Sequence, residues 1–123
     1  RSIMQSRYQN IKITKYQASG GKEYFLEIVN KDDILFGLLR LRIIKNKSIV
    51  RELHVYGKSL NIGEKGKVSQ HIGLGKLLMK EAEKISEKEK AKKIFVISGV
   101  GVRDYYRKLG YRLENTYMVK KIV

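Results

Sequence analysis

Residues 70–76 combine two glycines with polar side chains in a pattern suited to binding phosphate. The stretch reads Gln-His-Ile-Gly-Leu-Gly-Lys and runs directly into Leu77 and Leu78, where an amphipathic pattern begins. Two closely spaced glycines let the backbone approach a ligand, and the free N–H groups at the start of a helix attract anions. We therefore expect this turn to bind a pyrophosphate or a similar anion.

Two common glycine-rich motifs do not fit this stretch. Walker A requires Ser or Thr after Gly-Lys, and Leu77 follows Lys76 here. The dinucleotide-binding fingerprint requires a third glycine where Leu78 stands. The remaining pattern, Q-x-x-G-x-G, resembles the pyrophosphate-binding motif of the GNAT-type N-acetyltransferases. A glycine-assisted entry into a helix is the plain alternative.

Two adjacent tyrosines, Tyr105 and Tyr106, are the second group of residues that could take part in a reaction. They lie in a short segment that ends at Gly110 and is followed by Tyr111. A phenol with a pKa of about 10 is protonated at neutral pH and can donate a proton. Either tyrosine is therefore a candidate general acid.

Candidate bases are few: Glu52, His54 and His71. Glu52 and His54 interrupt an apolar stretch, where polar side chains need a reason, although His54 could equally be an ordinary structural histidine. The chain has two histidines and no cysteine. We therefore expect no metal site, disulfide, thiolate nucleophile or cysteine-held iron–sulfur cluster within it.

Length and charge narrow the class of protein. The 123 residues suit one domain, and because they open on Arg1 we expect the C-terminal fragment of a longer chain. No apolar run reaches the ~18–20 residues of a membrane span and no signal peptide is present, so we expect a cytoplasmic protein without a membrane partner. The net charge of +15 suits a nucleic acid or a phosphate-rich ligand, with general lysine enrichment as the alternative.

The periodicity of apolar residues predicts the elements that must position these groups. Residues from Leu74 onward should form an amphipathic helix, and 103–109 a short one that ends at Gly110. Strands are expected over 11–15, 23–29, 34–44 with a bend at Gly37, 49–57, 93–98 buried on both faces, 111–113 and 117–123. Residues 18–21, 30–33 and 45–47 should be turns, and 58–69 should be a mobile loop. Residues 1–9 show no period and should be a frayed lead-in.

This order of elements is the one in which GNAT domains assemble an acyl-CoA site. Longer strings at 51–57, 70–75 and 96–111 closely resemble the acetyltransferase domain of the Elongator catalytic-subunit family, and the likeness spans nearly the whole chain. The resemblance implies an α+β fold over residues 1–123 as a single GNAT domain. That fold has a mixed, twisted sheet of about six to seven strands flanked by helices.

The resemblance also implies residue roles. Tyr106 would contact the thioester and protonate the departing thiolate, with Tyr105 as its competitor, and Glu52 and His54 would be catalytic. The strand that contacts the pantetheine arm and acetyl carbonyl of acetyl-CoA would be Glu52, Leu53, His54 and Val55. The groups around the pyrophosphate would be Gln70, His71, Gly73, Leu74, Gly75 and Lys76.

Members of that family use acetyl-CoA and a radical S-adenosylmethionine domain to carboxymethylate the wobble uridine of tRNA. The resemblance therefore implies tRNA, acetyl-CoA and a radical domain of the same parent chain as partners, with the iron–sulfur cluster and S-adenosylmethionine held by that domain. Protein lysine acetylation, a non-catalytic module that binds acetyl-CoA or RNA, and self-association remain open. The basic charge favours tRNA over cationic histone tails.

Overall fold

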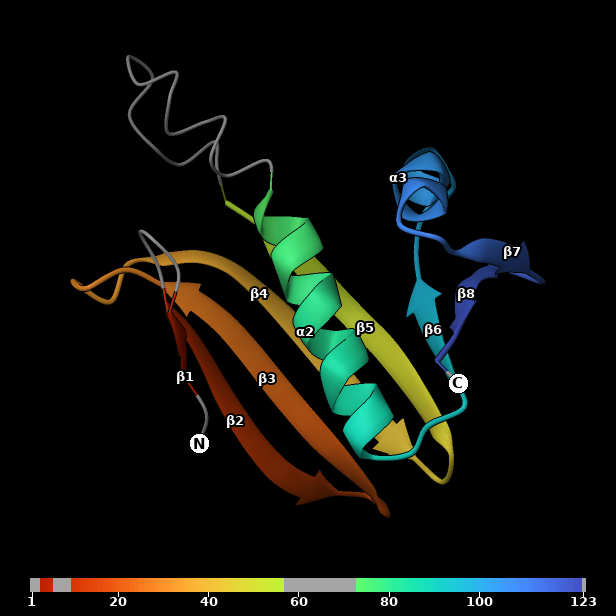
Figure 1. The fold of residues 1–123 in the computed structure, drawn as a ribbon, viewed down its shortest axis with the longest axis horizontal. Helices are drawn as coiled ribbons and strands as arrows, with labels where there is room; N and C mark the ends of the chain where they lie inside the picture. The colour runs from red at the N-terminus through yellow and green to blue at the C-terminus, as the bar shows by residue number, and fades with distance from the viewer. Residues whose placement is uncertain (1–2, 6–9, 57–72, 123) are drawn as a thin grey trace.

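A computed structural model describes residues 3–5, 10–56 and 73–122. Its eight-stranded sheet has the order β1-β2-β3-β4-β5-β6-β8-β7 and is antiparallel except between β5 and β6 (Figure 1). The predicted α+β class with a mixed sheet is confirmed. The strands are β1 (Ile3–Gln5), β2 (Asn10–Ala18), β3 (Gly21–Val29), β4 (Leu35–Ile44), β5 (Lys47–Val55), β6 (Lys93–Ile97), β7 (Arg112–Glu114) and β8 (Tyr117–Lys121).

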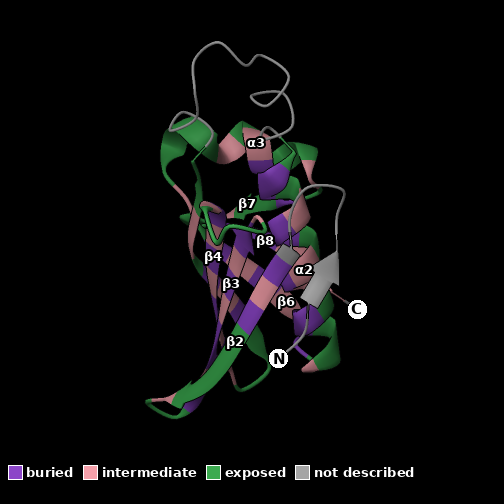
Figure 2. Ribbon diagram, turned by 90° about the vertical axis from the view of Figure 1, so that its left-hand side faces the viewer, coloured by how far each residue is buried: buried purple, intermediate pink, exposed green. Residues whose placement is uncertain are grey.

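The strands β2 to β5 form a meander of antiparallel hairpins. Ser19 and Gly20 join β2 to β3 with positive φ angles of 49° and 79°, the sign that a tight two-residue hairpin turn requires at both positions. The predicted turn at 18–21 is thereby confirmed. Figure 2 shows this end of the hairpin exposed, whereas buried residues gather along the middle of the strands.

Helix α2 (Leu74–Lys88) connects β5 to β6 and packs on β4 and β5. Its predicted apolar face is confirmed, because Leu78 and Ala82 are fully buried and Ile85 nearly so. Gly37 in β4 allows the close approach: a Cβ there would lie 3.3 Å from a Leu78 methyl carbon. The N-terminal half of the helix is thereby held against the ends of β4 and β5.

The C-terminal part continues from β6 through the turn η2 (Val100–Val102) into helix α3 (Arg103–Lys108), then β7 and β8. Strand β8 lies between β6 and β7. Gly110 has a positive φ of 96°, so the predicted left-handed end of the short helix is confirmed. In Figure 1, α3 stands beyond the end of β6, on the side of the sheet away from β1.

Three predictions differ from the structure. Ile3–Gln5 form an edge strand on β2, in a stretch without a period, and they bring the sheet to eight strands. The strand β6 is not buried on both faces, since Ile97 is 55% exposed. The bend expected at Gly37 is a shift of register with β3 in the structure, since Ile28 lies opposite Gly37 and Val29 lies opposite Leu35. The loop predicted at 58–69 lies outside the described residues.

No helix in the described ranges is long and apolar enough to cross a membrane.

Candidate functional site

The strands β5 and β6 pair at the start of β5 and then separate. Their parallel register runs from Lys47 opposite Lys93 to Val50 opposite Val96. Arg51 is an extra residue in β5 at this point, because Val50 and Glu52 lie opposite consecutive residues of β4. A bulge bends and twists a strand, so it turns the rest of β5 away from β6.

The backbone of residues 52–55 forms the open side of this separation. These residues pair with β4 on one side, and within the described strands they have no partner on the other. An exposed strand edge can bind an extended ligand through backbone hydrogen bonds. The edge is therefore suited to a linear amide-containing chain.

The N-terminus of α2 lies beside this edge. Gly73 is its N-cap residue, with no side-chain hydrogen bond to cap the helix and no acidic residue in the first turn. The first N–H groups of a helix have no partner within it and carry partial positive charge. These features, with the exposed Lys76, suit residues 73–76 to binding an anion, and we refer to them as the anion-binding turn.

Gly75 is the point where β5, α2 and α3 meet. A Cβ at this position would collide with the Tyr105 hydroxyl and would lie 3.8 Å from Val55 Cγ2. Gly75 is itself buried in the first turn of α2. The absence of a side chain here brings a phenol from α3 directly onto the anion-binding turn.

The two tyrosines of α3 have different surroundings. Tyr106 is 5% exposed and belongs to the hydrophobic core, whereas Tyr105 is partly buried against it. Their ring centroids are 5.1 Å apart, with an interplanar angle of 80°. Burial, together with the nearby Tyr105, raises the pKa of Tyr106 to about 12, and burial also raises the pKa of Tyr105. Both hydroxyls therefore keep their protons at neutral pH.

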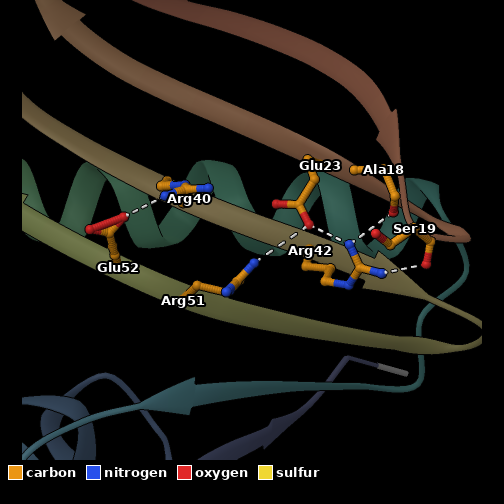
Figure 3. Close-up of polar contacts among 7 residues, drawn as sticks. All are labelled: Ala18, Ser19, Glu23, Arg40, Arg42, Arg51 and Glu52. Atoms are coloured by element: carbon orange, nitrogen blue, oxygen red, sulfur yellow. Dashed lines mark hydrogen bonds and ion pairs between the residues drawn. The ribbon is translucent and has the colours of Figure 1, made fainter.

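The Glu52 side chain lies on the face of the sheet opposite to α2 (Figure 3). His54, two residues further along β5, lies on the same face beside it. Arg40 donates a hydrogen bond of 3.0 Å to Glu52, and His54 Nε2 lies 3.5 Å from the other Glu52 carboxylate oxygen. The hydrogen bond from Arg40 is the main cause of a lowered pKa for Glu52. This carboxylate is therefore ionised at neutral pH and weakly basic.

The same face carries a second group of ion pairs around Glu23, which is 3% exposed. Arg42 donates to Glu23 at 2.5 Å and to the backbone oxygens of Ala18 and Ser19 at 3.0 Å, so it ties the β2–β3 turn to β4 (Figure 3). Arg51 lies 3.8 Å from the same carboxylate. These arginines have structural partners, and the sequence pattern alone did not reveal them.

The structure brings together only part of the predicted set. Gly75, in the turn at Gly73 to Lys76, lies beside Val55 of β5 and the Tyr105 hydroxyl, so these groups are close together. The Glu52 side chain, with His54 Nε2 3.5 Å from it, faces away from α2. Leu53 packs against the core, and the Leu74 side chain is buried, so Leu74 can serve a ligand only through its backbone. Gln70 and His71 lie outside the described residues. In the described ranges, no three potential metal ligands form a group.

Comparisons with known proteins agree on one family. The family model of the acetyltransferase (GNAT) domain matches residues 5–122. The chain is similar to Elongator complex protein 3 of Bos taurus, with 50% identity over 120 residues, which cover 87% of this chain and 22% of the relative. It is also similar to tRNA uridine(34) acetyltransferase of Dehalococcoides mccartyi, with 46% identity over 121 residues, which cover 87% and 26%.

Among solved structures, the chain resembles the archaeal Methanocaldococcus infernus Elp3 with an N-terminal deletion. The TM-score is 0.79 at 43% identity, over 93% of this chain and 30% of that one. The chain thus spans about a quarter of the length of the curated relatives that it matches.

Proposed function

The chain belongs to the GNAT acetyltransferase family, and we propose that it is the acetyl-CoA-binding domain of an Elongator-type enzyme that modifies the wobble uridine of tRNA. The observation that carries the proposal is the N-terminus of α2, which has no side-chain cap at Gly73, beside the edge of β5 that has no strand partner among the described residues. A pyrophosphate joined to a linear amide chain is complementary to that pair of features. The names of the relatives supply the tRNA part of the proposal.

The backbone holds the ligand in this proposal. N–H groups at Gly73, Leu74, Gly75 and Lys76 would bind the pyrophosphate, and residues 52–55 would bind the pantetheine amides and orient the acetyl carbonyl. When bound, acetyl-CoA supplies an activated acetyl thioester. Within the described residues, the helix start without a side-chain cap at Gly73 and the edge of β5 without a strand partner at 52–55 are the features that fit it.

Tyr106 is the proposed general acid. Its raised pKa, about 12, keeps the proton on the phenol oxygen at neutral pH, where the hydroxyl can donate to a departing thiolate. Tyr105 is the competing donor, because its hydroxyl lies against the first turn of α2. The family resemblance favours Tyr106, and comparing the turnover of Tyr106→Phe with that of Tyr105→Phe separates the two.

Glu52, His54 and His71 are the proposed bases. The Arg40 hydrogen bond keeps Glu52 ionised, and the nearby imidazole of His54 is 51% exposed, so both can receive a proton from the face opposite to α2. His71 lies outside the described residues and rests on the sequence motif alone. Arg40 lowers the pKa of Glu52, which makes this carboxylate a weaker base than an unpaired glutamate.

An assay of acetyl-CoA consumption with tRNA, with a lysine peptide or with neither tests the proposal. Consumption stimulated by tRNA supports it, whereas acetylation of the peptide alone would favour a protein lysine acetyltransferase. Binding of desulfo-CoA by calorimetry without consumption under any condition would indicate a non-catalytic binding module. A chain that binds no CoA at all would contradict the proposed site.

A further inference from the structure

Glu83 lies in the middle of α2 and contacts the segment that follows α3. The Tyr111 hydroxyl donates a 2.6 Å hydrogen bond to Glu83 Oε2, and Lys120 Nζ donates to Glu83 Oε1 at 3.3 Å. Lys120 also donates to the backbone oxygen of Leu109 at 3.2 Å, at the end of α3. One carboxylate therefore joins α2 to the residues that end α3 and to β8.

Tyr111 connects Glu83 to Tyr105 and Tyr106, because its ring packs against Tyr106. Its ring centroid is 6.0 Å from that of Tyr106 at an interplanar angle of 67°, and its backbone N–H donates to the backbone carbonyl oxygen of Tyr106 at 3.0 Å. Tyr106 in turn packs edge-on against Tyr105, whose hydroxyl lies against Gly75. The three rings thus run from Glu83 back to the first turn of the same helix.

This route begins and ends on α2, at positions about 12 Å apart along its axis at 1.5 Å per residue. A rigid helix therefore fixes both ends of the row of rings, Gly75 at one end and Glu83 at the other. The six residues of α3 pack mainly on η2, β7 and β8. The strands β5 and β6 do not pair beyond Val50 and Val96. Side-chain contacts must consequently set the distance between α3 and the anion-binding turn.

We propose that Glu83 is a positioning residue: its hydrogen bond with Tyr111 holds Tyr105 and Tyr106 at the first turn of α2. This inference rests on the proposed acyl-transfer function only for its effect on turnover, since the displacement of the rings can be measured without a ligand. Tyr111 is 3% exposed, so water cannot replace its partner freely. Losing the carboxylate leaves a buried hydroxyl unsatisfied and releases the row of rings.

The test compares four single variants. Glu83→Ala removes the acceptor, Tyr111→Phe removes the donor and keeps the ring, and Glu83→Gln keeps an oxygen that can accept from Tyr111. Glu87→Ala is the matched control, one turn further along α2 and exposed. In NMR spectra of tyrosine-labelled protein, the ring signals of Tyr105 and Tyr106 should shift in the first two variants and stay near wild type in the last two.

The kinetic part separates positioning from folding and binding. Glu83→Ala and Tyr111→Phe should lower kcat for acetyl-CoA consumption by roughly 10- to 100-fold, as expected for a small misplacement of reacting groups. The affinity for desulfo-CoA should stay within about twofold of wild type, because the anion-binding turn is untouched. The double variant Glu83→Ala/Tyr111→Phe should lose no more kcat than either single variant, since each of the two changes breaks the same hydrogen bond.

Unchanged ring signals and kcat in folded Glu83→Ala would overturn the proposal and leave Glu83 as a plain contact between elements. A loss in Glu83→Gln equal to that in Glu83→Ala would also contradict it, because the charge and not the hydrogen bond would then matter. If wild type consumes no acetyl-CoA, the proposed function fails, while the ring signals still decide whether Glu83 positions the tyrosines.

Discussion

At the scale of single residues, Gly75 has two separate reasons to be glycine. The sequence motif predicts that a side chain there would occupy ligand space, and the structure adds that a Cβ would collide with the Tyr105 hydroxyl. Overpacking of this kind costs ~1–3 kcal/mol. The two reasons can be separated by removing the Tyr105 hydroxyl in a Tyr105→Phe variant.

We expect Gly75→Ala to destabilise the protein by ~1–3 kcal/mol in the wild-type background. In a Tyr105→Phe background the nearest ring carbon is 3.4 Å from the new Cβ, an ordinary contact, so the same change should be neutral or stabilising by up to about 1 kcal/mol through helix propensity. Urea unfolding of the four proteins measures this. An equal loss in both backgrounds would show that Tyr105 is not the obstacle.

Calorimetry on the same four proteins addresses the ligand. Desulfo-CoA should bind more weakly whenever Ala occupies position 75, including in the stable double variant, because the methyl group still occupies the anion-binding turn. A folded Gly75→Glu variant that bound as well as wild type would remove the turn from the proposed site.

Tyr106→Phe should keep most of the affinity for CoA and slow thioester cleavage. The ring still packs in the core, and only the donor hydroxyl is lost, which should lower turnover by roughly 10²–10⁴-fold. Tyr105→Phe is the matched control on the adjacent residue. If Tyr105→Phe shows the larger loss, the assignment passes to Tyr105, and equal turnover in all three proteins would make both tyrosines structural.

At the scale of elements, local periodicity predicted most of the fold. Alternation in β4, with Leu39 and Leu41 buried on either side of the partly exposed Arg40, is visible in the sequence and is confirmed. The family resemblance is confirmed as well. The edge strand β1 was missed because its partner β2, and not its own pattern, determines its conformation.

The site was less predictable because its contacts are not local. The close approach of the Tyr105 hydroxyl to Gly75 and the hydrogen bond between Glu83 and Tyr111 join residues that are far apart in the sequence. The bulge at Arg51 appears only when β5 is paired with β4, since it is a mismatch of register. Anion binding at residues 73–76 thus stays a prediction of the motif, whereas the packing around these residues could be found only from the structure.

The C-terminal end of α2 is attached to the β2–β3 hairpin by Glu89. Lys22 donates to its carboxylate at 2.7 Å, and the Tyr24 hydroxyl donates to the other oxygen. Burial tends to raise the pKa of Glu89, but the hydrogen bonds from Lys22 and Tyr24 outweigh it, so the pKa is lowered. The folded state therefore favours the ionised carboxylate.

A lowered pKa fixes the sign of the pH dependence. The stabilisation by Glu89 is fully present above the pKa of the unfolded chain, about 4.5, and is lost as the pH falls through the lower folded value. Glu89→Gln should consequently flatten the acid side of the stability profile, measured by urea unfolding over a series of pH values. Glu87→Gln, with an exposed side chain, is the control, and an unchanged acid slope in Glu89→Gln would contradict the prediction.

At the scale of the whole molecule, the net charge of +15 predicts salt-dependent binding of tRNA. The arginines of the sheet face have carboxylate partners, so exposed lysines are better placed to neutralise phosphates. Lys76 lies in the first turn of α2 and Lys80 one turn further along, and both are exposed. We expect the affinity for tRNA to fall steeply as the salt concentration rises. Replacing both Lys76 and Lys80 by Gln should make this dependence of affinity on salt less steep.

Lys84 and Lys88 provide a matched control, because they are exposed on the same helix but closer to its other end. Their replacement by Gln should change the slope less, if tRNA approaches the N-terminal end of α2. Filter binding over a salt series measures both pairs. A flat salt response in wild type would mean that the charge is incidental, and equal effects of the two pairs would contradict the proposed direction of approach.

The last prediction concerns the reaction that the family resemblance implies. Radical chemistry with S-adenosylmethionine in that family requires an iron–sulfur cluster held by cysteine thiolates, and this sequence has no cysteine. This chain alone should therefore produce no 5-carboxymethyluridine when incubated with acetyl-CoA, S-adenosylmethionine, reductant and tRNA. Mass spectrometry of the digested nucleosides measures this, with a full-length relative as the positive control. Appearance of the modified base with this chain alone would contradict a division of the active site between this domain and a radical domain, because the carbon–carbon bond would then form without any cluster to generate the radical.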